Sequence, residues 1–463
     1  MKWLAHVVVV IILLSPLTET VAQNLALEEI VVTARKRDES LMTVPLAITA
    51  LSADTLEKMN LTTMEEVATF TPGFHYVAQT GGGSGRADRS ASSLVFRGLF
   101  LGTGNAGQSA GGLLFIDGAP VLGAQAPALL DYERVEVLKG PQSAYFGRSV
   151  LAGAINYVSR DPNTEEFQGR LDASYSSFQS VTAQVSMEGP VTDKFAIRVS
   201  ASHDKKGAQY DNAAQAGEEF GERKSDSVAL QFKFTPSENL SIKGMLNFIE
   251  HEDGPPAQAS LKGSQGDFNC QAGTRIFGYF CGKIPDTGDL DPSIISGNYV
   301  IGAESRPILV DNVNNFPVAF DPSFLDHGGL RRKAVNAHVI ADYETSNGYT
   351  LTSMTAYHTD KDMSIIDLNF RDFRNTPNIP FAFIFPNAPA LNRWQLVVQS
   401  KLRDWSQELR VTSPQDQQLR WHAGGNYLNT KSPGGTVYGL AVIGPGFFSS
   451  RTKIKSTTPS VYG

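Results

Sequence analysis

The sequence predicts a mainly β protein, in which a mixed α/β domain is followed by an incomplete antiparallel transmembrane β-barrel. From about residue 167, apolar and polar residues alternate over stretches of roughly ten residues, which is the pattern of β-strands. About 9–11 residues is also the length that a tilted strand needs to cross a bilayer. The connections between these stretches are mostly short on one side and long on the other, as in outer-membrane barrels.

An apolar leader opens the chain. Lys2 is followed by the apolar run Trp3 to Leu14, and Thr20 and Ala22 stand at the −3 and −1 positions of a cleavage site before Gln23. This arrangement predicts that residues 1–22 are a secretory signal peptide. A short membrane anchor is the alternative, although the apolar run is shorter than the roughly 20 residues that a spanning helix needs.

Composition narrows the class of protein. The chain has 463 residues and a formal net charge of −7, which argues against a nucleic-acid-binding surface. Its two cysteines, Cys270 and Cys281, lie close together in an exported chain. They predict one disulfide that closes a loop, with two free buried thiols as the alternative. A metal site is not expected, because a second pair of ligands is missing.

Residues 40–162 carry the signals of both helices and strands, separated by turns. A strand is expected over Val44 to Leu51, and Ser52 or Asp54 is expected to cap a helix after it. Thr62 to Glu65 has the spacing of a capping box before a second helix. SSLVFRGLF, GGLLFIDGAPV and YERVEVLKG are expected strands, and a short helix is expected after YERVEVLKG. The glycine-rich TGGGSGRADRS is expected to be a loop, because no GK[ST] follows it to make a phosphate loop.

Ten stretches of the second part alternate apolar and polar residues. They lie at 169–176, 180–188, 194–202, 227–234, 240–250, 333–344, 349–358, 405–412, 418–428 and, more weakly, 453–462. Alternation alone does not tell a lipid-facing residue from a core-facing one, so a soluble β-sandwich or propeller remains an alternative at this point.

Several motifs resemble those of TonB-dependent outer-membrane receptors. They are ALEEIVVTARKRDE, VFRGLF, FIDGAPV, DYERVEVLKGPQSAYFGRSVLAGAINYVSRDP and WSQELRVTSP. The resemblance covers the chain from Gln23 onward. It implies an N-terminal segment with a TonB box (23–39), a plug domain (40–162) and the first part of a barrel (163–463). Such barrels have roughly 22 strands, so the ten expected strands predict that the chain is a truncated part of a longer product.

The resemblance implies a partner for the N-terminal segment. The residues that match the TonB box are Glu28, Glu29, Ile30, Val31, Val32, Thr33 and Ala34. This segment is expected to add as a strand to the sheet edge of TonB, a periplasmic protein that transmits energy from the inner membrane. Its β-branched residues favour the extended chain that such pairing needs.

The resemblance also implies roles for residues of the plug motifs. Charged residues in these motifs are expected to pair with carboxylates of the barrel wall or with one another, and glycines are expected to serve tight turns and close packing. The candidate residues are Arg97, Gly98, Asp117, Gly118, Glu133, Arg134, Gly140 and Arg148.

The function implied is TonB-dependent active import of a scarce nutrient across the bacterial outer membrane. A ferric siderophore is the favoured ligand, while haem, cobalamin, an oligosaccharide or an aromatic compound remain alternatives, as does a fragment without function. The expected partners are TonB, outer-membrane lipid and the small-molecule ligand, with no nucleic acid. No catalytic constellation is recognised, so the chain is not expected to be an enzyme or to hold a cofactor.

Overall fold

The computed structural model describes fourteen parts of the chain. They are residues 31–33, 39–77, 89, 92–99, 112–122, 126–127, 129, 131–143, 150–212, 217, 219–257, 328–367, 394–440 and 449–462. Several predictions fall on residues outside the described ranges. They are the signal peptide, both cysteines, Arg148 and all but the first residues of the short helix expected after YERVEVLKG.

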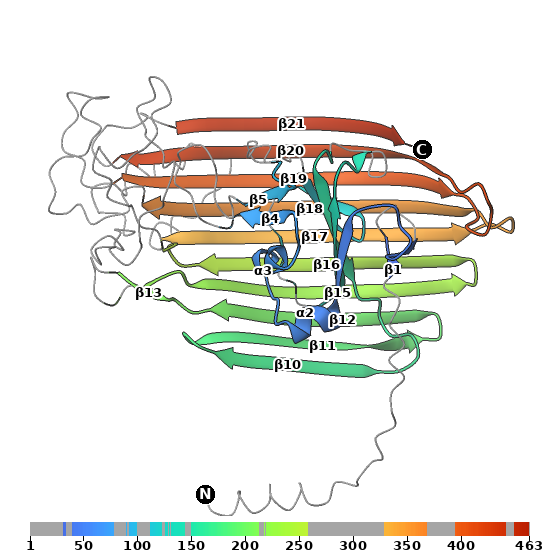
Figure 1. Cartoon of the computed structure of the whole chain (residues 1–463), viewed down its shortest axis with the longest axis horizontal. Coiled ribbons are helices and arrows are strands. Elements are labelled where there is room, and N and C mark those ends of the chain that lie inside the picture. The colour runs from blue at the N-terminus through green and yellow to red at the C-terminus, as the bar shows by residue number, and fades with distance from the viewer. Residues whose placement is uncertain are drawn as a thin grey trace, which may run out of the picture.

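The second part of the chain forms one antiparallel sheet of ten strands, in the order β10-β11-β12-β15-β16-β17-β18-β19-β20-β21. Its strands are β10 (Gln168–Ser176), β11 (Ser180–Thr192), β12 (Phe195–Lys206), β15 (Arg223–Ser237), β16 (Leu240–Asp253), β17 (Gly329–Glu344), β18 (Thr350–Asp367), β19 (Trp394–Thr412), β20 (His422–Leu440) and β21 (Ser449–Tyr462). Each strand pairs with its neighbour in the chain except that β13 (Tyr210–Asp211) and β14 (Glu219–Phe220) form a separate hairpin between β12 and β15. The sheet does not close, because β10 and β21 are its two ends (Figure 1).

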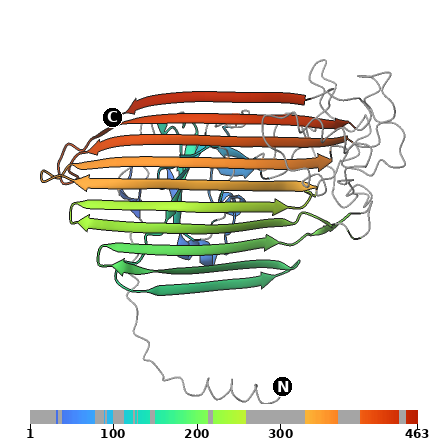
Figure 2. The same cartoon turned by 180° about the vertical axis from the view of Figure 1, so that it is seen from behind.

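The two faces of this sheet have opposite chemistry. The outer face, which is unobstructed in Figure 2, carries exposed apolar and aromatic residues such as Val228, Phe248 and Trp405. The inner face carries buried polar residues such as Asn247 and Asp404. Because a soluble sandwich buries its apolar face instead, this arrangement excludes the sandwich alternative and is that of an outer-membrane barrel wall.

Strands β18 and β19 of the sheet are longer than the alternating pattern predicts. Strands β18 and β19 extend to Asp367 and back from Trp394, well into a region expected to be loop. Outward positions there include Lys361 and Arg403. Outside the hydrocarbon layer, outward residues need not be apolar, so the alternation ends before the strand does.

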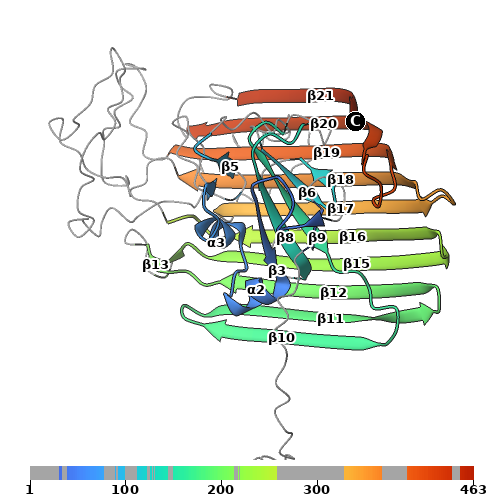
Figure 3. The same cartoon turned by 45° about the vertical axis from the view of Figure 1, so that its right-hand side comes forward.

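The first part of the chain is a compact α/β domain packed against the concave face of the wall (Figure 3). Its five-stranded sheet has the order β3-β8-β9-β6-β7. The strands are β3 (Ile48–Ser52), β6 (Gly112–Ile116), β7 (Ala119–Val121), β8 (Tyr132–Lys139) and β9 (Gly153–Ser159), and smaller pairs are β1 (Val31–Val32) with β2 (Glu39–Ser40) and β4 (Phe74–Val77) with β5 (Ser93–Phe96). Strand β3 begins four residues later than expected, since Val44 to Ala47 form irregular chain.

Two short helices cover this domain. Helix α2 (Ala53–Lys58) is capped by Ser52, whose side chain accepts a hydrogen bond from the Thr55 N–H. Helix α3 (Met64–Thr69) has a capping box between Thr63 and Glu66. The expected box at Thr62 and Glu65 is therefore wrong by one residue. With the box at Thr63 and Glu66, the helix points Met64 and Val67 into the core. Burial of these two side chains favours this box over the one at Thr62 and Glu65, which has the same residue spacing.

Among the described residues, no helix is long and apolar enough to cross a membrane.

Candidate functional site: the interface between plug and wall

Charged side chains join the α/β domain to the inner face of the wall. The partners across this interface are Glu57 with Arg170, Glu65 with Arg223, Glu66 with Lys206, Arg89 with Asp253, Asp117 with His338, Asp131 with Arg198, and Asp161 with Lys233 and Lys243. Most of these pairs place the carboxylate on the domain and the cation on the wall. The pairing orients the domain, while the net stabilisation is small because desolvation offsets the attraction.

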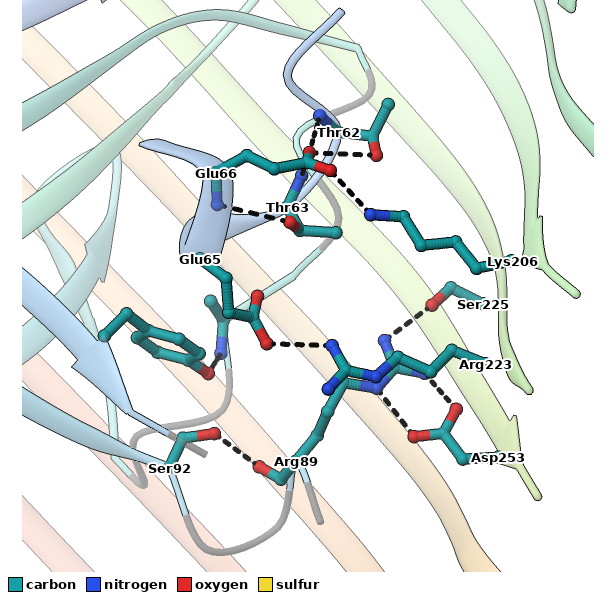
Figure 4. Close-up of polar contacts among 12 residues, drawn as sticks. Thr62, Thr63, Glu65, Glu66, Arg89, Ser92, Lys206, Arg223, Ser225 and Asp253 are labelled. Carbon is teal, nitrogen blue, oxygen red and sulfur yellow. Dashed lines mark hydrogen bonds and ion pairs between the residues drawn. The ribbon is translucent and has the colours of Figure 1, made fainter. Parts of the chain in front are cut away.

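Helix α3 positions one part of the interface. One oxygen of Glu66 accepts hydrogen bonds from the N–H groups of Thr62 and Thr63, at 2.7 and 3.0 Å, as part of the capping box. The other oxygen accepts from Nζ of Lys206 on β12 at 2.6 Å (Figure 4). Burial alone would raise the pKa of Glu66, but Lys206 and the two backbone donors outweigh it and lower the pKa. The cap of the helix is thus also its contact with the wall.

Arg89 makes the largest set of contacts with the wall. Its guanidinium donates to both oxygens of Asp253 and to the Ser225 Oγ at 2.9 Å (Figure 4). It also donates to the Lys224 carbonyl at 3.0 Å. The side chains of Arg89 and Asp253 are 14% and 7% exposed. Burial would lower the pKa of Arg89, and the Asp253 charge raises it above its usual value, so this cation stays charged.

A tight turn presents Asp117 to the wall. Asp117 and Gly118 both have positive φ, at 50° and 79°, as the two central residues of a type I′ turn do. The Asp117 carboxylate accepts from the N–H and Oγ of Ser159 at 2.9 and 2.6 Å, and it lies 3.1 Å from the Nε2 atom of His338 on β17. Burial would raise the pKa of Asp117, but these partners hold it well below its usual range.

Asp131, also at positive φ, contacts the wall from the position just before strand β8. It accepts a hydrogen bond from Nε2 of Gln184 at 3.0 Å and pairs with Arg198. Arg198 donates as well to Glu188 on the neighbouring strand at 2.6 Å. A cavity of about 240 Å³ lies beside this contact, between α2 and strands β10 and β11.

The N-terminal segment is docked on the same domain. Val31 and Val32 pair with Ser40 and Glu39, and the Val32 side chain is buried. The Thr33 N–H donates to Oε1 of Glu136 at 2.9 Å, and Nδ2 of Asn156 donates to the Thr33 Oγ1 at 3.1 Å. Three residues of the predicted TonB box are therefore held by the fold. Glu28, Glu29, Ile30 and Ala34 lie outside the described residues.

The other residues expected from the plug motifs have local roles in the structure. Arg134 pairs with Glu133 and, at 2.9 Å, with the buried Glu136, so these charges meet each other and not the wall. Arg97 and Gly98 have φ values of 50° and 77° in a second turn, and Gly140 has a φ of 123°. Within the described residues, Arg97 makes no ion pair with the wall.

Sequence reasoning missed Glu65, Glu66, Arg89 and Asp131. Glu65, Glu66 and Arg89 lie outside the recognised motifs, and Asp131 opens the motif DYERVEVLKG without being singled out in it. Arg89 and Asp253 are 164 positions apart. The expected capping box at Thr62 and Glu65 marked Glu65, and only as a cap, whereas the structure uses Glu66. In the part of the chain that the structure describes, no group of three or more histidine, cysteine, aspartate or glutamate residues could hold a metal ion.

Comparison with known proteins gives a consistent result. Residues 40–154 match the family model of the TonB-dependent receptor plug domain. The chain is 26% identical over 256 residues to the ferrioxamine receptor of Yersinia enterocolitica, which is 53% of this chain and 33% of that protein. It is 35% identical over 81 residues to the pesticin receptor of Yersinia pestis, which is 17% of this chain and 12% of that one.

A solved structure has the same fold. The ferripyoverdine receptor of the Pseudomonas aeruginosa outer membrane, bound to ferripyoverdine, superposes with a TM-score of 0.61 at 14% identity. The superposition covers 93% of this chain and 50% of that chain. The chain thus spans about half the length of this solved relative, and its ten-stranded sheet matches part of a barrel.

Proposed function

We propose that this chain, which belongs to the TonB-dependent receptors of the bacterial outer membrane, serves the active import of a ferric siderophore. In this proposal the domain over 40–162 is the plug and the ten-stranded sheet is part of the barrel wall. The ligand binds on the extracellular side, and energy from the inner membrane, delivered through TonB, displaces the plug.

The observation that carries the proposal is the polar seal between plug and wall. Among the described residues, the wall residues in the apolar clusters of the plug are Met245, Leu402 and Leu428, and Ala119 meets a small apolar group on β17 and β18. Ion pairs also join the two parts, among them Glu66 with Lys206 and Arg89 with Asp253. Such contacts orient a domain at little net cost to separate it, which suits a plug that must leave its place and return.

The N-terminal segment supports the role of TonB as partner. A strand that adds to a sheet edge binds mainly through its backbone groups. In the structure the Val31 and Val32 backbones pair within the chain, and Thr33 is bonded to Glu136. We infer that the segment is released from the plug before it pairs with TonB.

The names of the relatives support an iron chelate as substrate. Proteins similar to this chain are named as receptors for ferrioxamine and ferripyoverdine. The matches, at 26% and 24% identity, extend over only part of each protein. The ligand itself must therefore be identified by experiment, from a panel of ferric chelates.

The test is uptake of radiolabelled ligands by cells that produce the full-length receptor. Ferrioxamine B and ferripyoverdine, labelled with radioactive iron, are the first probes. They are followed by haem with the same label and by cobalamin labelled with radioactive cobalt. We expect uptake of one ferric siderophore that disappears both in cells without TonB and after deletion of Glu28 to Ala34. Uptake that persists without TonB would indicate a passive pore, and saturable uptake of haem or cobalamin alone would replace the siderophore as substrate.

A further inference from the structure

Two adjacent wall residues have buried polar atoms with no partner among the described residues. Both ring nitrogens of His251 and the Nη1 atom of Arg332 make no hydrogen bond. Each residue is only 2% exposed. Buried donors are nearly always satisfied in native proteins, so each exception needs a specific explanation.

These two side chains lie on the inner face of the wall. His251 on β16 is directly opposite Arg332 on β17, which brings their Cβ atoms within about 5.5 Å. The neighbouring pair, Glu250 and Lys333, points the other way and is 42% and 67% exposed. Alternation along each strand therefore directs His251 and Arg332 toward the lumen.

The plug approaches the wall at the same height. His251 is also paired in register with Ser225 on β15, and Ser225 accepts a hydrogen bond from Arg89 of the plug. Asp253, two residues further along β16, holds the same arginine. The unpartnered atoms thus lie next to the most extensive contact between plug and wall.

The charges around the two residues leave donors available. Nε and Nη2 of Arg332 are held by Asp360, at 2.7 to 3.0 Å, so the guanidinium is fixed and Nη1 has a set direction. Asp253 neutralises Arg89 in the same way. On the far side of Arg332, Asp362 is the register partner and accepts from Ser400. An imidazole carries one N–H when neutral and two when protonated.

We propose that His251 and Arg332 form a binding site for an oxyanion group of the imported ligand. An anionic oxygen accepts hydrogen bonds from Nη1 of Arg332 and from a ring N–H of His251, and such charge-assisted bonds are stronger than neutral ones. Because the site borders the Arg89 contact, a ligand bound there touches the position where the plug is held. This inference rests on the proposed function, since it names the chemistry of the same ligand.

The test is equilibrium binding of citrate, with inorganic phosphate as a second probe, to the purified full-length receptor. His251→Leu and Arg332→Gln are each expected to raise the dissociation constant about tenfold or more, as loss of a hydrogen bond to a charged group does. Lys333→Gln is the matched control, because it removes a charge from the same strand on the opposite face. Binding of citrate but not phosphate identifies a carboxylate site, and the reverse identifies a phosphate site.

A stability measurement separates this role from a structural one. Arg332→Gln leaves Asp360 buried without its cation and can unfold the receptor, whereas His251→Leu breaks no hydrogen bond. We expect His251→Leu to leave the melting temperature of the ligand-free receptor unchanged or higher while it weakens citrate binding. The inference would be overturned if the substitutions at His251 and Arg332 changed neither the citrate nor the phosphate dissociation constant. It would also be overturned if the unaltered receptor bound neither probe, and the unpartnered atoms would then be assigned to water.

The two proposals fail separately. If citrate binding depends on His251 but no ferric chelate is taken up in a TonB-dependent way, the oxyanion site stands and the import proposal falls. If TonB-dependent uptake is found and the His251→Leu receptor binds and imports as the unaltered one does, the oxyanion site alone is rejected.

Discussion

Glu66 performs two tasks with its two carboxylate oxygens. One oxygen caps helix α3 through the N–H groups of Thr62 and Thr63, and the other meets Lys206 on the wall. The order and position of the helix are therefore linked to its contact with the wall through a single side chain. Such a residue can pass a change at the wall directly to the plug.

This linkage predicts a pH effect. The pKa of Glu66 is lower in the folded protein than its usual value of 4.5, so its contribution to stability is complete above that value and is lost as the pH falls through the lowered pKa. We expect Glu66→Gln to cost up to about 1 kcal/mol, because the amide still accepts in the capping box but no longer carries the charge that pairs with Lys206. The variant is also expected to lose this acid dependence. Hydrogen exchange of the α3 amides between pH 3 and pH 7, corrected for intrinsic rates, measures both.

Asp54→Asn serves as the control for this prediction. Asp54 is on the neighbouring helix α2 and is 67% exposed, and its described partner is Lys58 of the same helix. If both variants change α3 exchange to the same extent, the linkage through Glu66 is wrong.

At the scale of elements, glycines set how closely the plug strands approach one another. Gly118 is in a turn with a φ of 79°, and a Cβ added there would touch nothing within 4 Å. Gly153 begins β9, and a Cβ there would lie 2.5 Å from the Leu138 carbonyl oxygen and from the Phe96 ring. The two positions require glycine for different reasons, one conformational and one steric.

These reasons predict different costs for alanine. Gly118→Ala is expected to cost about 1 kcal/mol, because it forces a positive φ on a residue with a side chain. Gly153→Ala is expected to cost more, about 1–3 kcal/mol, because backbone and ring must move. Urea unfolding of the plug in the two variants gives the comparison, and a larger loss for Gly118→Ala would contradict the packing of β8 against β9.

The docked N-terminal strand gives a second prediction for elements. Thr33→Val removes the side-chain contacts with Glu136 and Asn156 but keeps the backbone of β1. Because docking competes with TonB in the proposed function, we expect this variant to bind the periplasmic part of TonB a few-fold more tightly, which corresponds to roughly 1 kcal/mol. Thr43→Val is the control, because it alters an exposed hydroxyl that bonds only to the Ser40 carbonyl nearby. Weaker binding of TonB by Thr33→Val would contradict the competition between docking and TonB.

For the whole molecule, local patterns predict the strands but not what the strands face. Alternation gives each of the ten wall strands, including the weakest, β21, since side chains of period two mark a sheet with two different faces. Gly118 is likewise expected in a tight turn and lies in one, although GGLLFIDGAPV as a whole is expected to be strand and the turn at Asp117 and Gly118 divides it into β6 and β7. In both cases the signal lies within a few consecutive residues.

The contacts between plug and wall could not be predicted in this way. Glu65 and Arg223 are 158 positions apart and Arg89 and Asp253 164 positions apart, and which residues meet depends on the register of every strand between them. The unpartnered atoms of His251 and Arg332 have the same origin, because a sequence does not reveal which buried atoms lack a partner.

The central claim is that the plug moves from the wall at this polar seal during import. The most direct measurement is uptake of radioactive iron, from the ferric siderophore that the receptor takes up, after α3 has been tied to β12. In a receptor with serine at Cys270 and Cys281, Glu66→Cys and Lys206→Cys are introduced together and bridged by a thiol-reactive cross-linker. Each single cysteine variant, treated in the same way, is the control.

We expect the bridged receptor to bind its ferric chelate but to import no more than cells without TonB do, while both single variants import normally. Normal import by the bridged receptor would contradict the account, since the plug would then transport without leaving the wall at this seal.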